Sequence, residues 1–109
     1  MRQNIVVRNS VDADNMPAGG HAHGLGLNIQ WQDGPMRLPT SNQQVSANGA
    51  FVEDVLEVCQ RRIEFYQRSQ FACEENDEAI TAIGAARAAL ASRIARREAA
   101  GTQGTHEGA

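Results

Sequence analysis

The chain contains no lysine, and all ten of its positive charges are arginines. Arginine carries a planar fork that suits bidentate contacts to phosphate and stacking on bases, although GC-rich coding produces the same bias without any function. The formal net charge is −3 at pH 7. This acidic balance argues against a basic strip that follows a polynucleotide, because neutralising its phosphates needs clustered positive charge. We therefore expect no polymeric nucleic acid among the partners.

Long apolar runs are also missing. None approaches the roughly 20 residues that span a bilayer, and the N-terminal residues MRQNIVVRNS lack the apolar core of a signal peptide. We expect a cytosolic protein with no membrane partner. The two cysteines lie on opposite arms of the helical hairpin predicted below, offset by roughly 12 Å along its axis, which exceeds the roughly 7 Å limit for a disulfide. Cys59 and Cys73 are expected to be reduced, packed thiols.

The first half of the chain predicts a small antiparallel sheet, because it holds two short strand-like segments separated by turn residues, among them all three prolines and most of the glycines. Strands are predicted at residues 4–8 (NIVVR) and 25–32 (LGLNIQWQ), the second of which alternates apolar and polar positions. Residues 12–24 are rich in Gly, Ala and His, and residues 39–47 are rich in Ser, Asn and Gln. Both segments are predicted to be loops.

Two helices are predicted after residue 48. The first has Asn48 as its N-cap and runs to about Arg68, with apolar residues spaced by three and four. After a break at residues 69–71, the second helix begins near Cys73 and ends near Ala99. The predicted fold class is α+β, a single domain with segments 1–24 (strand and flexible loop), 25–47 (strand and loop) and 48–109 (helical hairpin and tail).

The second helix carries a countable seam, with spacings of three and four, formed by Cys73, Asn76, Ile80, Ile83, Arg87, Leu90 and Ile94. Taken alone, this seam favours a coiled-coil-like dimer or bundle in which Asn76 fixes the register. A structural scaffold protein without a small-molecule ligand is therefore one hypothesis for the function.

A second hypothesis is a nucleotide-binding module, which the aromatic, amide and guanidinium side chains of the hairpin favour. Tyr66 and Phe71 could stack a purine near the hairpin turn while Asn76 contacts its edge, although core packing is the default for Phe65 and Phe71. Arg93 and Arg97, one turn apart, suit a diphosphate, with solvated arginines as the alternative. Asn76 and Arg93 are 17 residues apart, or about 25 Å along a helix. One chain cannot close on a small nucleotide, so this hypothesis predicts an antiparallel dimer with two ligands.

Catalytic and metal-binding motifs are not evident. His21 and His23 form an HAH pair without the further Cys or carboxylate ligands of a structural zinc site. No nucleophile elbow, phosphate-binding loop or paired-carboxylate motif is present. We therefore expect a protein that is not an enzyme and that needs no cofactor or metal. The third and competing hypothesis is an enzyme that hydrolyses a nucleotide signal.

A family resemblance covers roughly residues 31–106. It consists of QDGP at 32–35, an NG pair at 48–49, RIEFYQRSQFACEEN at 62–76 and RIARREAAGTQGTH at 93–106. These segments resemble the phage anti-Thoeris sponge family, which captures cyclised ADP-ribose immune signals and leaves them intact. The resemblance implies a phage protein acting in the cytoplasm of the infected bacterium. It also implies a homodimer or homohexamer, and relatives look able to bind the cyclic di- or trinucleotides of the CBASS defence.

The same resemblance implies roles for individual residues. Base stacking falls on Tyr66, a polar contact on Asn76 and phosphate binding on Arg93. A loop arginine of the family has Arg37 as its candidate. The full set of predicted ligand-binding residues is Tyr66, Phe71, Asn76, Arg93, Arg97, Arg62, Arg37, Thr105 and His106.

Overall fold

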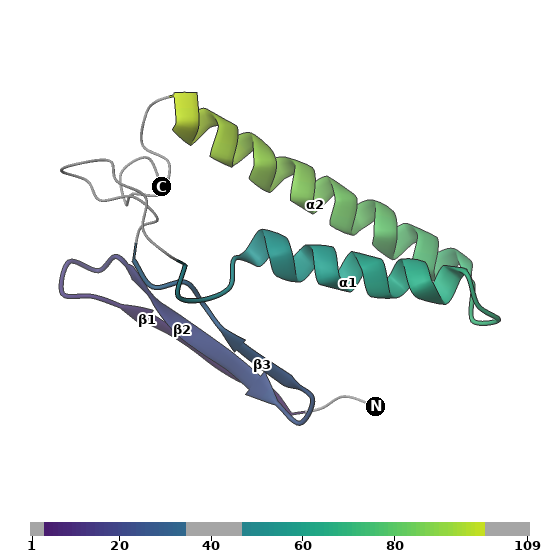
Figure 1. The fold of residues 1–109 in the computed structure, drawn as a ribbon, viewed down its shortest axis with the longest axis horizontal. Helices are drawn as coiled ribbons and strands as arrows, with labels where there is room; N and C mark the ends of the chain where they lie inside the picture. Colours follow the sequence, from purple (N-terminus) through teal and green to yellow (C-terminus); the bar gives the residue numbers. More distant parts are fainter. Residues whose placement is uncertain (1–3, 35–46, 100–109) are drawn as a thin grey trace. The chain divides into compact units, whose positions relative to one another are not determined.

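The structure is a computed structural model that describes residues 4–34 and 47–99. Three strands precede two helices along the chain: β1 (Val6–Val11), β2 (Pro17–Gly24), β3 (Leu27–Gln30), α1 (Val52–Gln67) and α2 (Glu74–Ala99). The chain divides into two compact units, one containing the sheet and the other, Val52–Arg96, containing the helical hairpin (Figure 1). The predicted α+β class, with an antiparallel sheet followed by a two-helix hairpin, is confirmed. Within the described residues, neither helix combines the length and apolar character needed to cross a membrane.

The sheet has the strand order β1-β2-β3, and both pairings are antiparallel (Figure 1). The prediction of a loop over residues 12–24 is wrong, because β2 is the central strand. His21, for example, pairs with Arg8 on one side and Gln30 on the other. The strand has few β-forming residues, but ladder bonds on both edges outweigh its weak propensity. Its glycines permit close approach: a Cβ on Gly20, where φ is +133°, would lie 2.2 Å from the Arg8 carbonyl oxygen.

The strand boundaries also differ from the prediction. β1 ends at Val11 rather than residue 8, and a tight turn follows in which Asp12 Oδ1 accepts hydrogen bonds from the backbone N–H groups of Asp14 (2.9 Å) and Met16 (3.0 Å). Asn15 completes the turn with a φ of 62°, a conformation that asparagine tolerates. β3 stops at Gln30. Beyond it, the Trp31 backbone N–H donates to the Gly20 carbonyl oxygen at 2.9 Å, and Trp31 forms an isolated parallel bridge with Ala50.

Asn48 is not the N-cap of the first helix, which begins at Val52. Its side chain instead binds the backbone of Asp33, accepting from N–H at 2.8 Å and donating to C=O at 2.9 Å. Gln32 Oε1 accepts from the Asn48 backbone N–H at 2.8 Å. A Cβ on Gly49 would lie 2.5 Å from the Trp31 carbonyl, so only glycine permits this approach. Gln32 and Asp33 are therefore hydrogen-bonded to the Asn48–Gly49 pair, a contact that the spacing of these residues in the sequence did not reveal.

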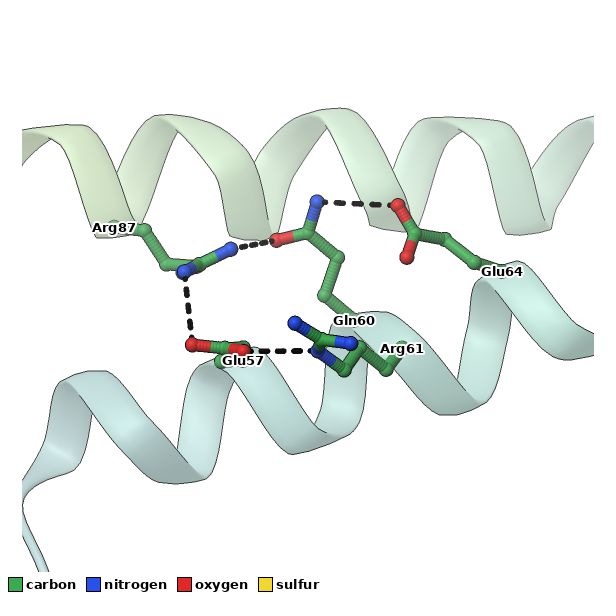
Figure 2. Close-up of polar contacts among 5 residues, drawn as sticks. All are labelled: Glu57, Gln60, Arg61, Glu64 and Arg87. Carbon is green, nitrogen blue, oxygen red and sulfur yellow. Dashed lines mark hydrogen bonds and ion pairs between the residues drawn. The ribbon is translucent and has the colours of Figure 1, made fainter.

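The hairpin matches the prediction more closely. α1 ends at Gln67 and α2 runs from Glu74 to Ala99, so the predicted break at residues 69–71 is confirmed. The predicted seam of α2 is also visible, since its positions from Asn76 to Ile94 are half-buried. Arg87 lies on this seam and donates to Gln60 Oε1 of α1 at 2.9 Å, with an ion pair to Glu57 at 3.3 Å (Figure 2). The seam thus packs, at least in part, within one hairpin.

Little of the described chain is buried. Ala22, at 8% exposure, is the only buried hydrophobic residue among those described, and Val58 and Phe71 are each 67% exposed. Cys59 and Cys73 are free, as predicted, but both are exposed, so the prediction of packed thiols is wrong. A 109-residue chain buries a modest fraction of its surface. Its apolar helix surface is therefore available to a partner.

Arg87→Ala should destabilise the hairpin by about 1 kcal/mol, because two contacts between helices are lost at a site that is only partly screened from water. Arg61→Ala is the matched control. Arg61 also pairs with Glu57, at 2.8 Å, but within α1, and its side chain is 74% exposed. Its loss should cost a few tenths of a kcal/mol. Equal shifts in urea unfolding for the two variants would contradict a role of Arg87 in joining the helices.

Candidate functional site

The turn between the helices brings together five residues that we call the turn site: Arg62, Tyr66, Gln67, Phe71 and Asn76. Ser69 fixes the path of the chain between them. Its hydroxyl donates to the Tyr66 carbonyl oxygen at 2.6 Å and accepts from the Phe71 backbone N–H at 3.1 Å. The last turn of α1 continues through backbone bonds from Arg68 and Ser69. Local hydrogen bonds therefore set the geometry of the turn site.

Gln67 closes this turn with both ends of its amide. Nε2 donates to the Cys73 carbonyl oxygen at 3.0 Å and to Asp77 Oδ1 at 2.9 Å. Oε1 accepts from the Cys73 backbone N–H at 3.0 Å and from Asn76 Nδ2 at 2.9 Å. Gln67 was not among the predicted site residues. Its only signal in the sequence was its place in the RIEFYQRSQFACEEN motif, where nothing distinguishes it from a solvated helix residue.

Asn76 lies in the first turn of α2, and its amide nitrogen has two partners. Nδ2 donates to Gln67 Oε1 at 2.9 Å and to the Phe71 carbonyl oxygen at 3.2 Å. An amide –NH₂ has two hydrogens, so both are used. The structure thus places Asn76 beside Phe71 and the end of α1, as the prediction of a shared site requires.

Arg62 covers the aromatic side chains of α1. Its guanidinium carbon lies 5.0 Å from the Phe65 ring centroid and 4.9 Å from the Tyr66 ring centroid, and Nε donates to Tyr66 Oη at 3.1 Å. These are cation–π distances. Phe65 is 50% exposed and Phe71 is 67% exposed, so the default expectation that both pack in a core is wrong. Exposed aromatic surface is therefore present at the turn site.

Arg93 lies away from the turn site along α2. Its Nη2 is 4.0 Å from Glu53 Oε1. Glu53 lies in the first turn of α1, and Tyr66 lies at the opposite end of that helix. The Arg93 and Glu53 side chains are 44% and 26% exposed, so their loose ion pair is open to competition. Arg97, half-buried, follows one turn later. A single hairpin therefore does not unite the aromatic and arginine parts of the predicted site.

Three predicted residues, Arg37, Thr105 and His106, lie outside the described residues. The histidine pair lies in β2 rather than in a loop, with the ring centroids of His21 and His23 5.2 Å apart. No group of three His, Cys, Asp or Glu side chains within residues 4–34 and 47–99 is arranged to hold a metal ion. A hollow of about 420 Å³ on the sheet unit is lined by Ser10, Ala18, Gly19, Gly20, His21, Asn28, Gln30, Trp31 and Asp33, none of them a predicted site residue.

No family model matches the chain. One curated relative does: the chain is 43% identical over 77 residues to "Thoeris anti-defense 1" of Bacillus phage SBSphiJ7, a match that covers 65% of this chain. This match confirms the predicted resemblance to an anti-Thoeris protein of a phage. The matched region spans only about half, 54%, of the length of that relative. The role that the relative's name gives it, defence against Thoeris immunity, is therefore a statement about the relative.

Tyr66→Phe tests the Arg62 contact directly. The ring that Arg62 covers is retained, but the hydroxyl acceptor for its Nε–H is lost, which is worth about 0.5 to 1.5 kcal/mol. We expect the Arg62 Hε proton to exchange with water on the order of threefold to tenfold faster by NMR. Arg61 Hε, bonded to Glu57 at 2.8 Å, is the internal control and should not change. Unchanged exchange at Arg62 would show that the hydroxyl does not hold the guanidinium.

Proposed function

We propose that the chain is a phage anti-defence protein that binds cyclised ADP-ribose immune signals and sequesters them without degrading them. The observation that carries this proposal is the turn site, where one hairpin turn presents exposed aromatic surface beside an oriented amide. Aromatic rings stack bases, and a neighbouring amide contacts the base edge. The similarity to a phage protein named for Thoeris anti-defense supports the anti-defence role.

The phosphates require a second protomer. Arg93 is separated from Asn76 by about 25 Å along α2, and its guanidinium pairs loosely with Glu53 at the far end of the hairpin. An antiparallel partner would place its own Arg93 beside the first chain's Tyr66 and Asn76, and two-fold symmetry would create two such pockets. Exposed apolar residues on α1, including Val58 and Phe65, support association. We propose a dimer as the binding unit, within which a diphosphate displaces Glu53 from Arg93.

Arg93→Ala should weaken binding of cyclic ADP-ribose tenfold to a hundredfold, because removing a charge-assisted phosphate contact costs about 1.5 to 3 kcal/mol. Calorimetry measures the affinity, and light scattering checks that assembly is intact. Arg96→Ala is the matched control, since Arg96 is an exposed arginine of the same helix outside the predicted site. If Arg93→Ala and Arg96→Ala bind equally well, the phosphate site is elsewhere, whereas a wild-type protein that binds no cyclic ADP-ribose would favour the scaffold hypothesis.

Ligand recovery separates a sponge from a hydrolase. We expect cyclic ADP-ribose released by heating the complex to be chemically unchanged by chromatography after overnight incubation. The physical reason is that the turn site offers aromatic stacking and a neutral amide, and the hydrogen bonds described there do not pair a nucleophile with a base. Linear ADP-ribose in the released fraction, growing with protein concentration, would contradict sequestration and favour the enzyme hypothesis.

A further inference from the structure

We propose that Gln67 is a positioning residue that makes Asn76 a pure hydrogen-bond acceptor, so that the pocket selects a base with an amino group over one with a carbonyl at the same position. The inference rests on the proposed function, because it concerns how the turn site reads its base. It adds a specificity determinant, Gln67, and a direction of discrimination, adenine over hypoxanthine.

The orientation of the Gln67 amide is fixed by backbone groups. An amide side chain can be turned over without changing its shape, so its partners decide which end is oxygen. The backbone of Cys73 identifies both ends of the Gln67 amide. Its carbonyl oxygen can only accept a hydrogen bond, and it lies 3.0 Å from Gln67 Nε2. Its backbone N–H can only donate, and it faces Gln67 Oε1 at 3.0 Å. Turning the amide over would break both bonds.

The orientation of Asn76 follows from that of Gln67. Its amide faces two acceptors, Gln67 Oε1 at 2.9 Å and the Phe71 carbonyl oxygen at 3.2 Å, so the group between them must be the –NH₂. Both amide hydrogens are thereby used within the protein. Among the described residues, no donor is paired with Asn76 Oδ1, and no unpartnered side-chain oxygen is buried. The carbonyl of Asn76 is therefore the end that remains accessible to a ligand.

This arrangement excludes the usual way in which asparagine reads adenine. That contact is bidentate, with the amide oxygen accepting from N6 and the amide nitrogen donating to N7. Here the nitrogen has no hydrogen left to donate, so a single contact from a ligand donor to Oδ1 remains. The 6-amino group of adenine can supply it. The 6-oxygen of hypoxanthine is an acceptor and would face Asn76 Oδ1, which is also an acceptor. The Asn76 amide cannot turn over to present its –NH₂ instead, because Gln67 Oε1 holds that group.

The test compares cyclic ADP-ribose with the analogue of the same ring linkage that carries hypoxanthine in place of adenine. Affinities of both are measured by calorimetry on the full chain. We expect the wild-type protein to prefer the adenine ligand by at least about tenfold, since a site that pairs with a donor rejects an analogue lacking it. Gln67→Met removes one of the two acceptors of the Asn76 amide nitrogen, which frees one amide hydrogen to donate to a base carbonyl. Its preference should fall to within about threefold.

Gln60→Met is the matched control, because Gln60 is also a half-buried glutamine of α1 but contacts Arg87 and Glu64 instead of the turn. It should keep the full preference. Asn76→Ala gives a second reading if Gln67→Met does not fold: adenine binding should weaken while hypoxanthine binding stays, so that the preference disappears. Circular dichroism confirms the helix content of each variant.

Two results would overturn the inference while leaving the proposed function standing: equal affinity of the wild-type protein for both ligands, or a full adenine preference retained in both Gln67→Met and Asn76→Ala. Failure of the wild-type protein to bind either ligand would overturn the proposed function together with the inference. Weaker binding of both ligands by the same factor in Gln67→Met would show that Gln67 only supports the turn, which also contradicts a role in specificity.

Discussion

The Gln67 amide is the interaction on which the rest of the turn site depends. It spans the gap between the end of α1 and the start of α2 with four hydrogen bonds, two of them to the backbone of Cys73. Such a side chain compensates for backbone groups that a helix break would leave unpaired. It also determines which atom of Asn76 is free. One residue thus links the closure of the hairpin to the chemistry that the hairpin can present.

A second constraint is distance. The hairpin holds its aromatic residues at the turn and Arg93 near the start of α1, where Glu53 is 4.0 Å away. No small cyclic nucleotide spans a helix of this length, so chemistry that needs both ends needs two chains. The exposed apolar side chains of α1 and the scarcity of buried residues in the described chain are consistent with that need. A pocket that uses both ends of the hairpin therefore forms only when two chains assemble.

Periodicity and breaks predicted the hairpin well, because helix 74–99 has a long seam with spacings of three and four. β2 was missed because its glycines, alanines and histidines resemble a loop, and only pairing on both edges makes them a strand. Asn48 was wrongly predicted to cap the first helix, because its actual partner, the backbone of Asp33, is remote in sequence. The site residues Tyr66 and Asn76 came from a motif. Gln67 could not be recognised, since its role depends on atoms that meet only after the turn forms.

Mixing two inactive variants tests the two-chain pocket most directly. Tyr66→Ala and Arg93→Ala are each expected to bind cyclic ADP-ribose weakly, and unfolding and reassembling them together creates mixed dimers. If each pocket takes Tyr66 from one chain and Arg93 from the other, every mixed dimer regains one intact pocket. Tight binding should then return at about a quarter of all sites, by two-fold symmetry and random pairing. Calorimetry that finds no tight sites in the reassembled mixture would contradict the account.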